Sequence, residues 1–459
     1  MVFTSGASVF TIPAGVPFAE ALAAGIMDLY ADRPEALSAC RVLLPTRRAC
    51  RTLREGFLRH SDGHPLLLPR MQPIGDVEED ELSFADADLR LPPAMSSLQR
   101  QMILARLIAK LPGMSRAPAQ DLALADALGR LMDQIYTEGL SMDALAGIVP
   151  EALAAHWGIT LTFLTILGES WPAILAEHGM IDAADRRNRL IAALTAHWRE
   201  KPPETPVIAA GSTGSIPTTA ALLKVVADLP QGLVVLPGLD QEIDSASWSA
   251  MNDAHPQATL KQLLSHLEQA RTDVRVWPYG DLPKGAGAES YADTRRWLAR
   301  ELMRPAATVG RWQETPLSPE QKDRLRRTLE GVMRFDCDTP QEEALLIALL
   351  MRETLEEPGR TTTLVTSDRA LARRVAASCR RWGIYLDDSA GQPLSGTSAG
   401  VFFRLIAQAC ETEFRPGVFL SLLRHSLLTC PLDGGLVNAL EIGVLRGPAP
   451  RAGLAGIQT

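Results

Sequence analysis

The chain has 459 residues and a formal net charge of −8 at neutral pH. This length predicts two or three domains, because a typical domain holds roughly 100–200 residues. A compact nucleic-acid-binding protein is usually basic, but an acidic total does not exclude such binding, because local charge sets the field that a ligand meets. No apolar run reaches the ~20 residues of a membrane span, and the N-terminus lacks the basic region of a signal peptide. We therefore expect a globular, cytoplasmic protein.

The first predicted strand, residues 8–12, leads into a glycine turn and then a helix over 19–27. A P-loop at such a place reads G-x-x-x-x-G-K-[ST], in which amides wrap phosphate, the lysine reaches the β- and γ-phosphates and the hydroxyl holds Mg²⁺. Here Val16-Pro17-Phe18 stands instead, and a proline has no N–H to donate. The turn Pro13-Ala14-Gly15 is therefore interpreted as a degenerate nucleotide site.

A second strand is predicted over 41–45, and a basic helix follows it. Residues 41–60 hold six arginines against the single acid Glu55, and three of the arginines share one face at i, i+4 and i+7. Arginines at a strand-to-helix turn can hold phosphates with fork-like donors and the helix N-terminus. The alternative is a solvated face that pairs with the acidic segment 76–88. The DNA-binding candidates here are Thr46, Arg47, Arg48, Arg51 and Arg54.

Residues 93–204 read as an all-helical insertion, because apolar residues recur at helical spacing over 98–108, 122–135 and 159–175. The α/β pattern then returns, with strands at 206–210 and 233–237 around a helix at 218–229. The turn 211–215 could bind an anion in a nest of backbone amides. Without a lysine or an Asp-Glu pair to hold a metal, a tight structural turn is the preferred interpretation. An irregular stretch from 240 to 319 is predicted to hold a helix at 260–269 and a strand at 274–277.

A second α/β unit is predicted to begin near residue 331. Its expected strands cover 334–337, 362–366 and 384–387, and its expected helices cover 341–355, 368–382, 399–411, 416–424 and 436–445. The helix after the second of these strands carries another arginine row. Residues 369–381 contain five arginines and no acid, and Arg369 and Arg373 are further DNA-binding candidates. Two such rows could line one groove, holding DNA by its phosphates without reading its sequence.

The order of these segments resembles the AddB subunit of the AddAB helicase–nucleases, over essentially the whole chain. The segments that carry the resemblance are VFTIPAGVPFAEAL, RVLLPTRRACRTLREGFLR, LLLPRMQPIGDVEEDEL, AAGSTGSIPTTAALL, FDCDTPQEEALLIA and TLVTSDRALARRVAASCRRWGIYLDDSAGQPL. The run from Leu43 to Ala49 is similar to helicase motif Ia, which touches single-stranded DNA in superfamily-one helicases. The first turn occupies the Walker A place.

This resemblance implies a RecA-like α/β fold with parallel sheets. The first helicase-like domain would be residues 1–92 plus 205–330, the helical insertion 93–204, and an incomplete second domain 331–459. The family's C-terminal nuclease domain, with its iron–sulfur cysteines in some members and its metal, would lie beyond residue 459. No catalytic residue and no metal site are predicted within the chain. The six single cysteines, none in a C-x-x-C pair, are expected to be structural thiols.

The implied function is that of a non-catalytic subunit in the recombinational repair of double-strand breaks. Its partners would be the AddA helicase–nuclease, which would use ATP and Mg²⁺ for translocation, and single- and double-stranded DNA, which it would scan for Chi. Two alternatives remain open. The chain could be an active ATPase with a divergent P-loop, in which Arg47 replaces the lysine. It could also be a protein scaffold for AddA without DNA contact.

Overall fold

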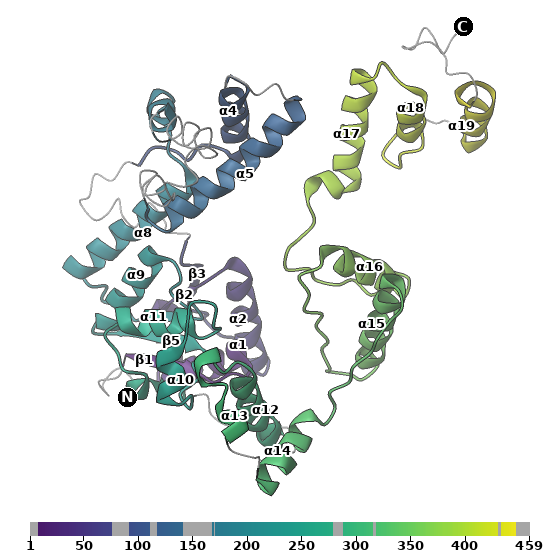
Figure 1. The fold of residues 1–459 in the computed structure, drawn as a ribbon. Coiled ribbons are helices and arrows are strands. Elements are labelled where there is room, and N and C mark those ends of the chain that lie inside the picture. The colour runs from purple at the N-terminus through teal and green to yellow at the C-terminus, as the bar shows by residue number, and fades with distance from the viewer. Residues whose placement is uncertain are drawn as a thin grey trace. The chain divides into compact units, whose positions relative to one another are not determined.

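A computed structural model describes residues 8–75, 91–110, 117–140, 168, 170–278, 288–314, 318–429 and 433–446. The chain divides into two compact units, residues 1–331 and 332–459, and each is considered by itself. The first unit runs from purple to green in Figure 1, and the second from green to yellow. The acidic segment 76–88, proposed as a partner for the first arginine row, lies outside the described residues.

A six-stranded, all-parallel sheet forms the centre of the first unit, in the order β3-β2-β4-β5-β1-β6. The strands are β1 (Val9–Ile12), β2 (Arg41–Leu44), β3 (Arg70–Pro73), β4 (Val207–Ala210), β5 (Gly232–Pro237) and β6 (Arg275–Val276). Five of these strands, β1, β2, β4, β5 and β6, lie where strands were predicted, and those predictions are confirmed. β3 was not predicted. The helical insertion separates β3 from β4 in sequence, yet β4 pairs directly with β2.

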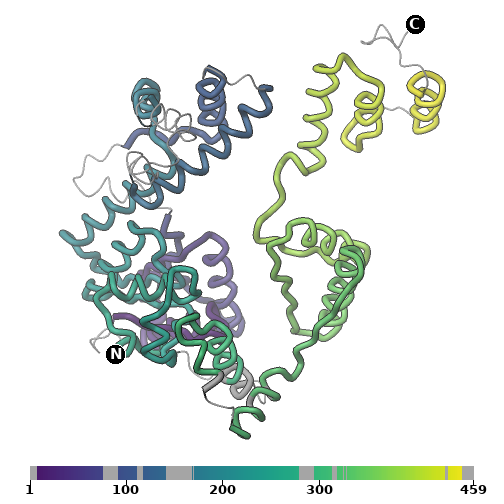
Figure 2. Tube along the Cα trace, viewed as in Figure 1, coloured from purple at the N-terminus to yellow at the C-terminus, as the bar shows by residue number. Residues whose placement is uncertain are grey.

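Both faces of this sheet are covered, which explains why β1 and β4 are buried along their whole length. Alternate residues of β1 enter opposite cores: Phe10 packs with α1 (Phe18–Leu29) and α2 (Arg47–His60), whereas Val9 packs on the other face. That other face is covered by α8 (Ala183–Glu200), α9 (Pro217–Asp228) and α11 (Ala258–His266). The same layers can be followed in Figures 1 and 2.

The described part of the insertion is helical, as predicted. It contains α4 (Ser97–Ala109), α5 (Pro118–Thr137), a further helical stretch at 170–177 and α8. Trp171 is fully buried in the core of this bundle, and its indole N–H donates to Asp182 at 2.6 Å. Arg100 joins α4 to α5 and α8 through Asp133 at 2.6 Å and Asp182 at 3.1 Å. No helix among the described residues is both long and apolar enough to cross a bilayer.

The stretch 240–319 was predicted to be irregular, and this was partly wrong. Besides α11 and β6, which lie where a helix and a strand were expected, it holds three more helices. These helices were not predicted because their sequences are polar, and the hydrophobic pattern of an amphipathic helix can be recognised only where there is a broad apolar face. In the longest of these three helices, Arg300 forms ion pairs with Asp240 and Glu242, at 2.8 Å each. These helices are α10 (Ser245–Ala250), α12 (Ala288–Leu302) and α13 (Arg311–Glu314), and α14 (Pro319–Leu329) follows at the end of the unit.

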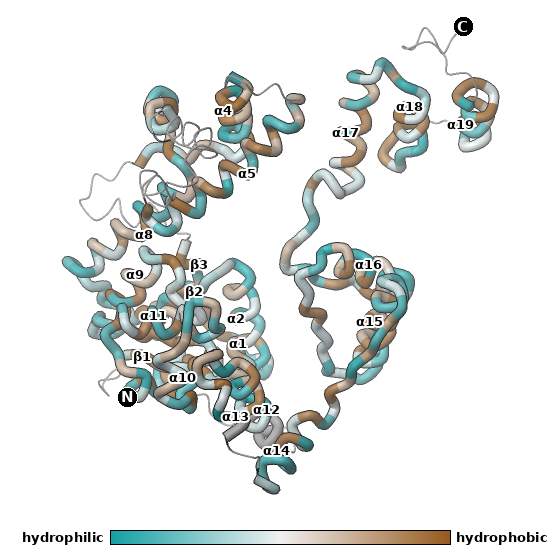
Figure 3. Tube along the Cα trace, in the orientation of Figure 1, coloured by the Kyte–Doolittle hydropathy of each residue, from teal (hydrophilic) through white to brown (hydrophobic). Residues whose placement is uncertain are grey.

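The second unit contains the predicted helices but none of its predicted strands. The helices are α15 (Pro340–Leu355), α16 (Arg369–Arg380), α17 (Ser398–Glu411), α18 (Pro416–Leu423) and α19 (Gly434–Leu440), followed by a π-helical turn (Glu441–Leu445). Hydrophobic residues recur along α15 and α17 (Figure 3).

The segments 334–337, 362–366 and 384–387 carry no strand pairing, so the prediction of strands there was wrong. Their alternating apolar residues do pack: Leu364, Ile384 and Leu386 lie against the core between α15 and α16. The apolar pattern of a segment shows only that some of its side chains can pack inward. It could not supply the hydrogen-bonded neighbour, about 4.8 Å away, that makes an extended segment a strand.

Candidate nucleic-acid interface

The turn after β1 is closed on itself. Val16 N–H donates to the Pro13 carbonyl at 3.2 Å, and Gly15, the third residue of this turn, has φ +85°. A positive φ at this position is the mark of a type II turn, which glycine adopts without strain. A phosphate-binding loop needs amide groups that point at the ligand. Here the Val16 amide is used internally, and Pro17, the N-cap of α1, has none.

Phe18 fills the space beside this turn. A Cβ built at Gly211, the first residue after β4, would lie 3.2 Å from the Phe18 ring and 3.6 Å from Pro45. The Ala14 carbonyl accepts a hydrogen bond of 2.8 Å from Arg296 of α12. An aromatic ring therefore lies close to Gly211, and the turn after β1 is held by hydrogen bonds to protein groups. This geometry does not favour a divergent P-loop.

The arginine row of α2 is exposed along its length. The helix begins after β2 with Thr46 as its N-cap, whose hydroxyl accepts the Ala49 amide at 3.1 Å. The opposite face, with Cys50, Leu53 and Phe57, is buried against β2 and α1. The exposed side chains are the sequence candidates Arg47, Arg48, Arg51 and Arg54.

Two arginines of α2 form ion pairs with nearby glutamates. Arg51 forms an ion pair of 3.4 Å with Glu55, which lies one turn away on the same helix. Exposed pairs of this kind contribute only ~0.3–0.5 kcal/mol. Arg59, also on α2, pairs with Glu20 of α1 and so faces away from the candidate row. The row still presents its guanidinium groups to solvent, because all four candidate arginines are exposed.

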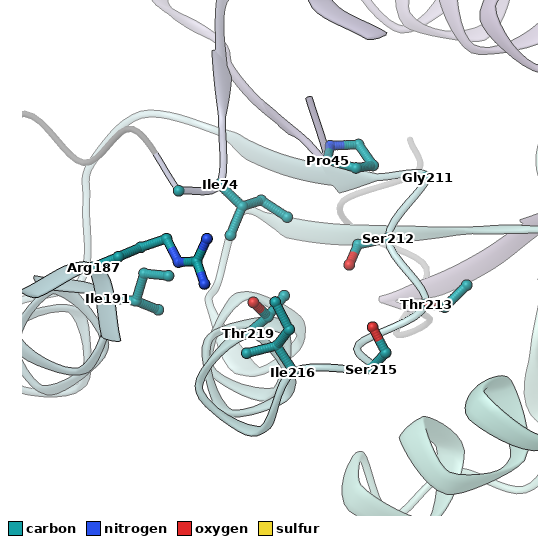
Figure 4. Close-up of a pocket in the computed structure, with 11 residues that line it drawn as sticks. Pro45, Ile74, Arg187, Ile191, Gly211, Ser212, Thr213, Ser215, Ile216 and Thr219 are labelled. Carbon is teal, nitrogen blue, oxygen red and sulfur yellow. The ribbon is translucent and has the colours of Figure 1, made fainter. Parts of the chain in front are cut away.

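A cavity of about 240 Å³ opens beside this row, at the edge of the sheet where the parallel strands end. Residues that follow three neighbouring strands line it: Pro45 after β2, Gly75 after β3 and Gly211 after β4. We name it the Arg187 cavity, because that side chain reaches into it from α8 (Figure 4). Its other lining residues are Ile74, Ile191, Ser212, Thr213, Ser215, Ile216 and Thr219.

Two glycines shape the turn that borders the cavity. Gly211 and Gly214 have φ values of +78° and +63°, a region that residues with a Cβ rarely adopt. The turn then enters α9, whose N-cap is Ile216 and whose first residue is Pro217. Neither residue offers a side-chain oxygen to the first amides of the helix. The tight turn expected from the sequence is present, and it also brings its hydroxyl groups to one cavity wall.

The second arginine row differs at its N-terminus. Arg369 of α16 makes a two-pronged ion pair with Asp388, at 3.0 and 2.6 Å, and also donates to the Gly391 carbonyl at 3.2 Å. Arg373 and Arg374 are exposed. This row belongs to the second unit and α2 to the first, so the single groove suggested by the sequence stays a prediction.

Sequence reasoning missed Arg187. It lies in the run Arg186-Arg187-Asn188-Arg189, and nothing in that run distinguishes the arginine that enters the cavity. Arg189 instead pairs with Asp185 at 2.8 Å, and Arg186 donates to the Pro92 carbonyl at 3.0 Å. The only available signal was helical spacing, because Arg187 stands four residues before the buried Ile191.

The described residues contain no group of three or more potential metal ligands. His60 and His64 are four residues apart, a spacing that can hold a metal when both histidines lie on one face of a helix. Because α2 ends at His60, the two do not share a helix face. The five cysteines that the structure describes are free thiols. No protein-family model matches the chain, and no curated protein matches it.

Proposed function

We propose that this protein is a non-catalytic, helicase-like DNA-binding subunit of an ATP-dependent helicase–nuclease of the AddAB type. In this proposal it holds single-stranded DNA for Chi scanning during double-strand break repair, while an AddA partner supplies translocation. The six-stranded parallel sheet, interrupted by a helical insertion, is consistent with the RecA-like fold that the proposal needs. The closed turn beside Phe18 supports the absence of catalysis.

One observation carries the DNA-binding part: the exposed arginine row of α2 begins at the carboxyl end of β2. Ligands of open parallel sheets bind outside the carboxyl ends of the strands. Arginine donates planar, fork-like hydrogen bonds that match phosphate oxygens. A row of them over about two helical turns suits a sugar–phosphate backbone, and such contacts fix position without selecting sequence.

Salt dependence tests this part directly. The variant with Arg47, Arg51 and Arg54 all replaced by Ala should bind a fluorescent single-stranded oligonucleotide more weakly. The slope of log K against log salt should fall by ~2, since each phosphate contact on a single strand contributes ~0.7. The matched control replaces Arg33, Arg130 and Arg189, which removes the same charge elsewhere in the first unit and should leave the slope unchanged.

Equal slopes for the two triple variants would remove the DNA face from α2. No measurable binding of DNA by the unmodified chain would favour the scaffold alternative instead. The ATPase alternative has its own test, which is equilibrium dialysis with radiolabelled ATP and Mg²⁺. Saturable ATP binding that is lost in a Gly15→Val variant would contradict the proposal that this subunit is non-catalytic.

A further inference from the structure

The Arg187 cavity has the electrostatic character of an anion site. Within the part of the chain that the structure describes, its lining contains one guanidinium group and four residues with hydroxyl groups, Ser212, Thr213, Ser215 and Thr219, and no aspartate or glutamate. The Ser212 hydroxyl also accepts the Gly214 amide at 3.2 Å. Among the described residues Arg187 forms no ion pair, and its hydrogen bond is the one from Nη2 to the Thr137 hydroxyl, at 3.3 Å. A positive charge in a recess without a carboxylate favours an anion from outside.

A second observation points to a missing ligand. The Nε atom of Arg187 is shielded from solvent and has no hydrogen-bond partner in the structure. A buried donor without an acceptor is costly, and native proteins rarely leave one unpaired. The stem of this side chain is also held in place, because a Cβ at Gly75 would lie 3.2 Å from Arg187 Cδ. Figure 4 shows the guanidinium extending from α8 toward Thr219 and the turn at Ser212.

The wall opposite Arg187 is the start of α9, a helix of 12 residues. It has no side-chain cap and no acidic residue in its first turn, and its Thr219 and Ile216 line the cavity. The partial positive charge at a helix N-terminus stabilises an anion nearby. Arg187 and this helix end therefore act on the same space from two sides.

We infer that the Arg187 cavity binds a phosphate group, held between the guanidinium of Arg187, the hydroxyl groups of the 212–219 segment and the N-terminus of α9. The volume of about 240 Å³ accommodates one phosphate group with some water. Pro45 lines the cavity and directly precedes Thr46, so the cavity lies close to the N-terminal end of α2, where the arginine row begins. That the phosphate is a phosphodiester of single-stranded DNA rests on the proposed function; free phosphate has the same chemistry.

The test compares Arg187→Gln with Arg189→Gln, a neighbour on the same helix that pairs with Asp185 instead. The first probe is inorganic phosphate, with the shift of the thermal unfolding midpoint as readout. Phosphate should stabilise the unmodified protein and the Arg189→Gln control, since a ligand that binds only the folded state raises its stability. Chloride at equal ionic strength controls for charge screening, and the comparison of the two variants removes the effect of phosphate's exclusion from the surface, which should act on both variants equally.

The second probe is a fluorescent single-stranded oligonucleotide. If the phosphate belongs to DNA, Arg187→Gln should weaken binding about 10-fold or more, the factor that a charge-assisted hydrogen bond supplies. The salt slope should fall by ~0.7. If free phosphate is the ligand, the oligonucleotide affinity stays unchanged while the phosphate shift is lost. If Arg187→Gln fails to fold, Thr219→Val removes a lining hydroxyl without changing the charge and should reduce the same responses.

The inference is overturned if phosphate gives the unmodified protein and Arg187→Gln the same shift, or no shift, and DNA binds both equally. That result leaves the α2 row untouched, because the row is tested by its own triple variant. The opposite outcome is also distinguishable. If the α2 triple variant keeps the salt slope of the unmodified protein, while phosphate raises the unfolding midpoint of the unmodified protein but not that of Arg187→Gln, the proposed function is removed and the phosphate site is kept.

Discussion

The helices α2 and α16 carry nearly the same sequence pattern, yet the structure gives them different N-termini. Both follow an extended segment, and both place arginines on one face and bury the opposite face, around Phe57 in α2 and Val375 in α16. The cap of α2 is the neutral hydroxyl of Thr46. The cap of α16 is the carboxylate of Asp368, which accepts the amides of Ala370 at 2.7 Å and Leu371 at 3.2 Å.

This difference shows that arginine spacing alone does not define an anion site. At α16 two carboxylates already occupy the donors that a phosphate would use: Asp368 takes the first amides, and Asp388 takes the Arg369 guanidinium. The hydrogen bond from the Ala370 amide, followed by that from Leu371, holds the pKa of Asp368 below its ordinary value. The positive end of α16 is therefore neutralised within its own unit, whereas the start of α2 is capped without charge.

The largest predicted effect is a loss of stability when a side chain on the buried face of α2 or α16 is truncated. Phe57→Ala should destabilise the first unit by about 3–5 kcal/mol, the usual cost of removing a buried phenylalanine ring. Val375→Ala removes fewer atoms and should cost the second unit about 2 kcal/mol. Hydrogen exchange followed by mass spectrometry can separate the two, because each variant should reduce protection only in its own unit. Loss of protection in both units from either variant would contradict two separate cores.

The next effect concerns DNA. Replacing Arg373, Arg374 and Arg380 of α16 by Ala should lower the salt slope for single-stranded DNA by less than the ~2 expected for the α2 triple variant. The reason is that the first turn of α16 already holds two carboxylates. The same oligonucleotide titration measures both. A larger loss from the α16 variant would reverse the proposed order of the two rows.

The caps should respond differently to acid. Thr46→Ala should cost about 0.5–2 kcal/mol, the usual value of an N-cap hydroxyl, at every pH. The folded protein lowers the pKa of Asp368 from its ordinary 3.8. Its stabilising contribution is therefore present above pH 3.8 and lost as the pH falls below that value. Comparing the unfolding midpoints of unmodified protein and Asp368→Ser at pH 6 and pH 3 measures this, and a difference that stays constant with pH would contradict it.

The smallest effect is expected from Asp388→Asn. This change removes the charged partner of Arg369, so the N-terminus of α16 should become a better anion site. Exposed ion pairs contribute ~0.2–1 kcal/mol, and the gain in oligonucleotide affinity should therefore not exceed about fivefold. Asp336→Asn, which removes an exposed carboxylate that pairs with Arg334 before α15, is the matched control. A drop in affinity for Asp388→Asn would mean that Asp388 orients Arg369 toward the ligand.

Much of the fold could be predicted because its signals are local. Continuous apolar runs identified β1, β2, β4 and β5, and helical spacing identified most helices. β3 escaped because Arg70-Met71-Gln72-Pro73 has neither alternation nor a buried run. The polar helices α10, α12 and α14 escaped because they lack a broad apolar face. Ion pairs contribute instead at α10, whose N-cap Asp244 pairs with Arg304 at 2.7 Å, and at α12, whose Arg300 pairs with Asp240 at 2.8 Å.

One part of the candidate site could likewise be predicted from the sequence, and another part could not. The exposed row on α2 follows from residue spacing and from the charge of arginine, which burial would penalise. The cavity could not be foreseen, because it joins Pro45, Gly75, Arg187 and the turn after β4 from distant parts of the chain.

By itself, the sequence determined most of the helices with a broad apolar face, the exposed arginine row of α2, and that the first turn lacks the lysine and amide donors of a P-loop. These follow from periodicity and side-chain chemistry within a few residues. The tertiary structure decided that β4 lies beside β2, that Phe18 lies next to Gly211, and that Arg187 enters a recess in which the described residues supply no carboxylate. Such contacts depend on how elements far apart in the chain pack, and no local pattern encodes the distance between them.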